Sequence, residues 1–93
     1  MREKYKPNDI LEIIWIDTHS APTGWMDEEE VNDMIEQINN HIMHTVGYFL
    51  RETKDFLYVL QTYDRQESRR VDGIIAITKG TIKKINKLRS SNK

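Results

Sequence analysis

The side chains best suited to ligand chemistry in this sequence are a tryptophan, a tyrosine and an arginine beside polar segments. Trp25 follows the Thr- and Ser-containing segment 18–24, Tyr63 ends an apolar run, and Arg65 begins the charged segment after it. Aromatic faces stack on nucleobases, and guanidinium groups form charge-assisted hydrogen bonds with phosphates. Loops that flank a rigid sheet often carry binding residues. The three residues therefore predict a site for a flat, anionic ligand.

Hydroxyl, imidazole and ammonium groups near these positions are further candidates for contacts with base edges or phosphates. They are Thr18, His19, Ser20 and Lys79. Each aromatic candidate also has a structural interpretation, because Trp15 and Trp25 could pack in a core. Arg65, together with Arg69 and Arg70, could equally be a solvated loop charge.

Catalytic and metal-binding patterns are not found in the sequence. The chain has no cysteine, and it has no Gly-x-Ser-x-Gly, phosphate-loop or dinucleotide pattern. His41 and His44 are three residues apart, but an element boundary is expected between them, so they and His19 make a weak metal site. The carboxylates of 27–36 are expected on a solvated helix face that would not tune their acidity. We expect no catalytic residue, no metal and no cofactor.

Length and composition predict one small domain over residues 1–93, with residues 90–93 as a disordered tail. A chain of 93 residues is too short for two separate cores, and 38% hydrophobic with 31% charged residues is typical of a folded protein. The apolar run 10–16 contains Glu12, so neither a signal peptide nor a membrane span is expected. The cytoplasm is the expected compartment.

The net charge of −1 conceals an uneven distribution along the chain. The acidic side chains of the middle are Asp27, Glu28, Glu29, Glu30, Asp33 and Glu36. The basic side chains of the end are Lys79, Lys83, Lys84, Lys87, Arg89 and Lys93. These segments could be solvated faces paired between subunits or, for the basic one, an anion-binding surface. Because a core this small leaves apolar surface exposed, we expect a homo-oligomer.

Apolar periodicity predicts one helix and four or five strands. Strands are expected over 10–17, 42–52, 56–63 and 71–78, where β-branched and aromatic residues cluster between turn signals. Asp27 is the expected N-cap of a helix over 28–40. Its inner stripe, expected in the core, is Val31, Met34, Ile35 and Ile38. The segment 81–88 fits a strand or a second helix. The predicted fold class is α+β, a small, curled, barrel-like antiparallel sheet with one helix inserted after the first strand.

A set of short blocks resembles a widespread family of small phage-encoded proteins. The blocks are Trp15-x-Asp17, Gly24-Trp25, Thr45-Val46-Gly47-Tyr48-Phe49-Leu50 and Gly73-x-x-x-Ile77-x-Lys79-Gly80-x-Ile82. The chain departs from the family pattern at Tyr48, where tryptophan is usual, and at Thr78, where proline often stands. The resemblance implies a sponge that sequesters cyclic dinucleotides, such as cyclic GMP-AMP, of the CBASS antiphage defence without cleaving them. It also implies a symmetric oligomer, a tetramer, in the host cytoplasm.

Two other functions fit the sequence. The acidic helix could attach a phage factor to a host protein, and the basic end of the chain could make a small-barrel binder of RNA or single-stranded DNA. The slight net acidity argues against polynucleotide binding, which usually needs a strongly basic domain. The identity and linkage of a cyclic nucleotide, and its stoichiometry per oligomer, do not follow from the residues.

Overall fold

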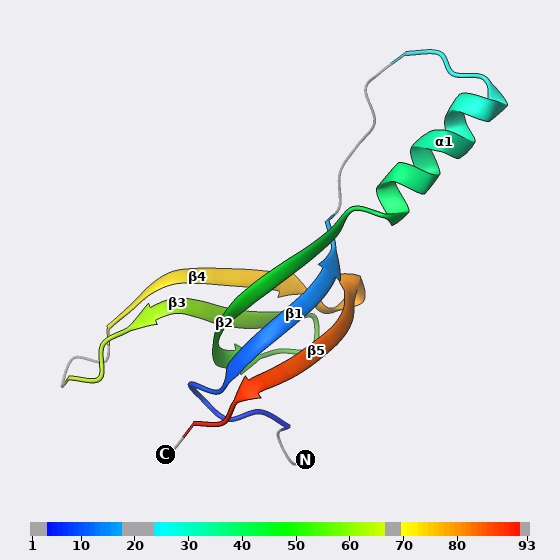
Figure 1. Cartoon of the computed structure of the whole chain (residues 1–93). Coiled ribbons are helices and arrows are strands. Elements are labelled where there is room, and N and C mark those ends of the chain that lie inside the picture. The colour runs from blue at the N-terminus through cyan, green and yellow to red at the C-terminus, as the bar shows by residue number, and fades with distance from the viewer. Residues whose placement is uncertain (1–3, 18–23, 67–69, 92–93) are drawn as a thin grey trace.

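The computed structural model describes residues 4–17, 24–66 and 70–91. Its elements in chain order are β1 (Ile10–Ile16), α1 (Glu28–Asn39), β2 (Ile42–Glu52), β3 (Phe56–Tyr63), β4 (Val71–Thr78), the 3-10 turn η1 (Lys79–Thr81) and β5 (Ile82–Arg89). The sheet has the order β4-β3-β2-β1-β5, with every neighbouring pair antiparallel. This confirms the predicted fold class of a curled antiparallel sheet with one helix after the first strand (Figure 1).

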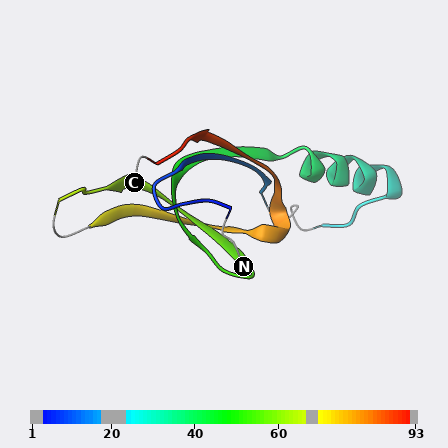
Figure 2. The ribbon, with the colours of Figure 1, turned by 90° about the horizontal axis from the view of Figure 1, so that it is seen from below.

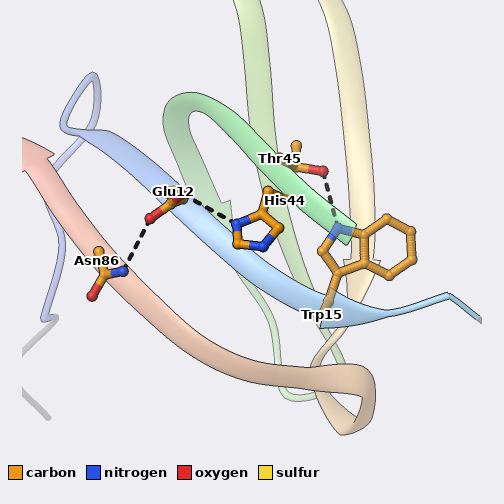
Figure 3. Close-up of polar contacts among 5 residues, drawn as sticks. All are labelled: Glu12, Trp15, His44, Thr45 and Asn86. Carbon is orange, nitrogen blue, oxygen red and sulfur yellow. Dashed lines mark hydrogen bonds and ion pairs between the residues drawn. The ribbon is translucent and has the colours of Figure 1, made fainter. Parts of the chain in front are cut away.

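The sheet curls but does not close, and β4 and β5 form its two edges. Seen from below, the strands bend around the N-terminal segment (Figure 2). The core lies on this inner face. It consists of Tyr5, Leu11, Ile13, Phe49, Leu57, Val59 and Ile77. Trp15 packs against this core and donates its indole N–H to the Thr45 hydroxyl at 2.9 Å (Figure 3), so it is a core-edge residue.

The segment 81–88, for which strand and helix both fitted the sequence, is part of β5. Ile82, Ile85 and Leu88 recur every third residue between lysines, a spacing that does not distinguish the two structures. In the structure this segment is a strand because it pairs with β1. The register of this pairing shifts between Ile10 and Leu11 and again between Ile14 and Trp15. These irregularities bend the ladder and break the strict alternation that a strand would otherwise show.

A single carboxylate fastens both ends of the described chain to the sheet. Asp9, which is 1% exposed, accepts backbone N–H groups from Lys6 at 2.9 Å and Ser91 at 2.7 Å. The Lys87 ammonium lies 3.5 Å from the same carboxylate. Ser91 belongs to the segment 90–93, for which a disordered tail was predicted, and its backbone N–H is bonded to Asp9 just before β1. Residues 92–93 lie outside the described part.

The helix begins at the predicted N-cap, Asp27, but contributes no residue to the core. Asp27 accepts the backbone N–H of Glu30 at 2.8 Å, and the Glu30 side chain accepts the backbone N–H of Asp27 at 3.5 Å, which completes a capping box. No residue of α1 is buried, and Val31 and Ile35 are exposed. In both views α1 projects away from the sheet (Figures 1 and 2). The expectation that its apolar stripe belongs to the core is wrong, because amphipathic spacing shows only that one face needs a partner.

Candidate ligand-binding site

A pocket of about 800 Å³ lies where the start of β1, the second half of β2 and the ends of β3 and β5 meet. Its lining combines aromatic and basic side chains with apolar ones. The residues that bear on ligand chemistry are Tyr48, Arg51, Tyr63, Asp64, Arg65 and Arg89. Ligand pockets in proteins usually have volumes of about 300–1,000 Å³ and a few convergent polar groups. The pocket therefore has the size and composition of a small-molecule site.

The aromatic part of the pocket is built by two tyrosines on adjacent strands. Tyr48 pairs with Leu60 across the β2–β3 ladder, and Leu60 is 1% exposed in the pocket wall. The rings of Tyr48 and Tyr63 meet edge to face, with centroids 4.8 Å apart and an interplanar angle of 89°. Each tyrosine is half-buried, so part of each ring remains accessible to a stacking partner.

The basic part of the pocket is built by three arginines on different elements. Arg51 comes from the end of β2, Arg65 from the segment after β3, and Arg89 from the end of β5, and all three are exposed. Asp64 is the one acidic residue among the described residues of the lining, and it lies 3.7 Å from the Arg70 guanidinium. Since guanidinium groups bind phosphates and carboxylates bidentately, the pocket favours an anion.

The structure brings two of the predicted site residues together and separates Trp25 and Lys79 from them. Tyr63 and Arg65 both line the pocket. Trp25 is 103% exposed and precedes the projecting helix, so it is neither a core residue nor part of the pocket. Lys79 lies at the other end of β4 and makes an ion pair with Glu52 at 2.6 Å. The candidates Thr18, His19 and Ser20 lie outside the described residues.

Three residues of the pocket were not predicted as site residues from the sequence. Tyr48 and Arg51 lie within an ordinary strand pattern, and Arg89 directly follows the segment 81–88, for which strand and helix both fitted the sequence. The signal that connects them is strand register. Ile10 is paired with Tyr48 on one side and with Arg89 on the other, which places Tyr48 and Arg89 on the two strands beside it. Arg51 follows three residues after Tyr48 on β2.

A polar row crosses the sheet on its outer face, opposite the core (Figure 3). Glu12 accepts the side-chain amide of Asn86 at 3.0 Å, and its other carboxylate oxygen lies 3.3 Å from Nδ1 of His44. The hydrogen bonds from Asn86 and His44 lower the pKa of the Glu12 carboxyl below its ordinary value. Glu12 is thus held as a carboxylate acceptor.

The histidines weighed as metal ligands do not form a cluster in the described part of the chain. Within residues 4–17, 24–66 and 70–91, no group of three or more His, Cys, Asp or Glu side chains could hold a metal ion. His19, the third histidine, lies outside these ranges. In the same ranges no helix has the length and apolar character needed to cross a membrane.

Comparisons with models of known protein families, with curated proteins and with solved structures found no match.

Proposed function

We propose that this chain is a phage immune-evasion protein that binds a cyclic dinucleotide in the pocket between β1, β2, β3 and β5 and sequesters it without cleaving it. The observation that carries the proposal is the convergence of Tyr48 and Tyr63 with Arg51, Arg65 and Arg89 around one pocket. A cyclic dinucleotide presents two bases that can stack on aromatic rings and two phosphates that guanidinium groups can neutralise.

The sequence resemblance to small phage-encoded proteins supports the same ligand class. It also supports action in the cytoplasm of the infected bacterium, as a symmetric homo-oligomer such as a tetramer. We therefore propose stoichiometric removal of a signalling nucleotide, so that the number of protein copies sets the amount of signal withdrawn.

Calorimetric titration of the purified protein with cyclic GMP-AMP tests the proposal. Arg51→Ala and Arg65→Ala each remove a hydrogen bond to a charged group, which is typically a loss of about 1.5–3 kcal/mol, so affinity should fall about 10- to 150-fold. Tyr63→Ala should weaken binding by a similar factor through lost stacking.

Lys83→Ala is the matched control, because Lys83 is an exposed cation on β5 about 20 Å along the strand from Arg89. Its affinity should equal that of the unaltered protein. Unchanged affinity in Arg51→Ala, Arg65→Ala and Tyr63→Ala together would reject this site. Mass spectrometry of the ligand released by heating should recover cyclic GMP-AMP intact, and a linear product would reject the non-enzymatic assignment.

A further inference from the structure

The helix α1 carries an apolar stripe that the described part of the chain does not bury. Met34 and Ile38 are half-buried, whereas Val31 is 40% and Ile35 is 51% exposed. The four residues recur at helical spacing and so lie on one face. A helix of this length has marginal stability in water unless that face packs against a partner.

The connection to the sheet holds α1 away from its own strands. Only Asn40 and His41 separate the helix from β2, and their backbone groups are bonded on both sides. The N–H of His41 is bonded to the carbonyl of Ile38 at 3.2 Å, and the N–H of Ile42 to the carbonyl of Asn40 at 2.9 Å. The carbonyl of His41 also accepts the N–H of Asp17 at 3.1 Å. Folding the helix back onto its own sheet would break these bonds.

The outer face of the sheet carries a second uncovered apolar surface near the helix. Register and strand alternation place Ile14, Ile16, Ile42 and Val46 together on this face, which we call the outer patch. Ile42 is 42% and Val46 is 54% exposed. The polar row crosses this patch, because Val46 is paired with Glu12 and His44 lies between Ile42 and Val46 on β2. The pocket begins beyond the Glu12–Val46 pair, at Ile10 and Tyr48, so it borders the outer patch without sharing a residue with it.

The acidic charge of α1 favours the outer patch of a second copy over a second α1 helix as its partner. The segment Glu28–Asn39 contains five acidic residues and no lysine or arginine, so two copies of α1 would repel each other. The outer patch, in contrast, is bordered by the basic strand β5, where Lys84 is paired with Ile14. An acidic helix with an apolar stripe thus has a complementary surface in the same sequence, but one that its own connection prevents it from reaching.

We infer that α1 docks on the outer patch of a second copy of this chain, and that the two copies exchange helices reciprocally about a twofold axis. In this arrangement Val31 and Ile35 of one copy cover Ile42 and Val46 of the other, and the acidic flanks of the helix face β5. Each copy gives one helix and receives one, so the exchange pairs the copies in twos, and a tetramer would be built from two such dimers. The inference does not depend on the proposed ligand, because α1 and the outer patch share no residue with the pocket.

Disulfide trapping tests the exchange directly, since the chain contains no cysteine of its own. Ile35→Cys and Val46→Cys are prepared as separate proteins, mixed, and oxidised briefly. The expected product is a disulfide-linked heterodimer, identified by mass spectrometry. Glu36→Cys, on the polar side of the same helix, is the matched control and should give much less heterodimer with Val46→Cys.

Three results would overturn the exchange. The first is equal trapping by Ile35→Cys and Glu36→Cys. The second is a predominance of Ile35→Cys homodimers, which would indicate helix-to-helix pairing. The third is an intramolecular disulfide in the Ile35→Cys/Val46→Cys double variant at high dilution, which would indicate docking on the chain's own sheet.

The mass in solution gives a second test. Light scattering should give at least twice 11.1 kDa for the unaltered protein, and Ile35→Asp should reduce that mass by a factor of two or more. Ile35 is not part of the core, so this variant should keep the sheet, as far-UV circular dichroism would show. A single-copy mass for the unaltered protein would overturn the exchange. Loss of cyclic GMP-AMP binding in pocket variants that remain dimeric would concern the proposed function alone.

Discussion

Asp9 is the residue on which the two ends of the described chain depend. Burial by itself would raise the pKa of this carboxyl, but the backbone N–H groups of Lys6 and Ser91 and the Lys87 ammonium outweigh burial and lower it. A lowered pKa means that the folded state binds fewer protons than the unfolded state in acid. The stability that the Asp9 carboxylate provides is therefore present at neutral pH and is lost as the pH falls below about 4.

We expect Asp9→Asn to lower the melting temperature at neutral pH and to have a smaller effect in acid. Melting curves of Asp9→Asn and of the unaltered protein would be recorded from about pH 6 to about pH 3. The difference between their melting temperatures should become smaller as the pH falls. Asp55→Asn, at an exposed carboxyl, is the control. A difference between Asp9→Asn and the unaltered protein that stays constant with pH would contradict the role given to the charge.

Trp25 allows a second test at the scale of single residues. Replacing a buried tryptophan with alanine typically lowers the free energy of unfolding by about 3–5 kcal/mol. A substitution at an exposed position usually changes it by less than about 0.5 kcal/mol. Because the side chain is 103% exposed, we expect Trp25→Ala to fall in the second class. Chemical denaturation would measure the free energy of unfolding, and a loss of several kcal/mol would show that the side chain is packed.

At the scale of elements, the pairing of β2 with β3 depends on a glycine. A Cβ at Gly47 would lie 3.0 Å from the backbone oxygen of Leu60 and 3.0 Å from the Val59 side chain. We expect Gly47→Ala to destabilise the protein by about 1–3 kcal/mol, since overpacking at this point pushes against backbone. Gly80→Ala is the control, with nothing within 4 Å of the added methyl group. Thermal unfolding should therefore separate the two variants clearly.

The helix depends on its N-cap because no residue of α1 is buried within its own copy. Asp27→Ala removes the acceptor for the Glu30 N–H, a loss of about 1 kcal/mol, and no buried residue of α1 offsets it. We expect a clear drop in the helical signal of far-UV circular dichroism. Asp33→Ala, inside the helix, should keep or raise that signal because alanine is the better helix former. Equal signals from the two variants would contradict the importance of the cap.

The elements were more predictable from the sequence than their assembly. Each strand is indicated by a run of β-branched residues, and the helix start is indicated by the Asp27–Glu30 cap. Both signals consist of residues that are close together in the sequence, so they can be recognised without knowledge of the fold. The partner of the stripe that includes Val31 and Ile35 could not be predicted, because periodicity does not distinguish a core from an interface. Tyr63 and Arg65 were predicted together because they are two residues apart in the sequence. Arg89 is distant in the sequence and comes near them only because β5 pairs with β1, where Arg89 is opposite Ile10.

At the scale of the whole molecule, the projecting helix makes a single copy unusually extended. Its radius of gyration is 17.1 Å and its extents are 58 × 25 × 22 Å. A compact chain of this length would have a radius of gyration of about 12 Å. Small-angle scattering of Ile35→Asp, on the fraction that has the mass of one copy, should give a value close to 17.1 Å. A value near 12 Å would show that the helix folds back when its partner is absent.

The position of β1 between β2 and β5 affects the order in which the protein can form during synthesis. Of the five strands of this sheet, β1 leaves the ribosome first and β5 last, yet the two are neighbours, with Ile10 paired with Arg89. Until β5 has been synthesised, the β1 edge that pairs with it has no partner, and the Asp9 carboxylate lacks its hydrogen bond from the Ser91 N–H. Contacts this distant in sequence form slowly, and an unpaired strand edge invites association with other nascent chains. Ribosomes that pause before β5 would therefore leave an incomplete sheet prone to aggregation.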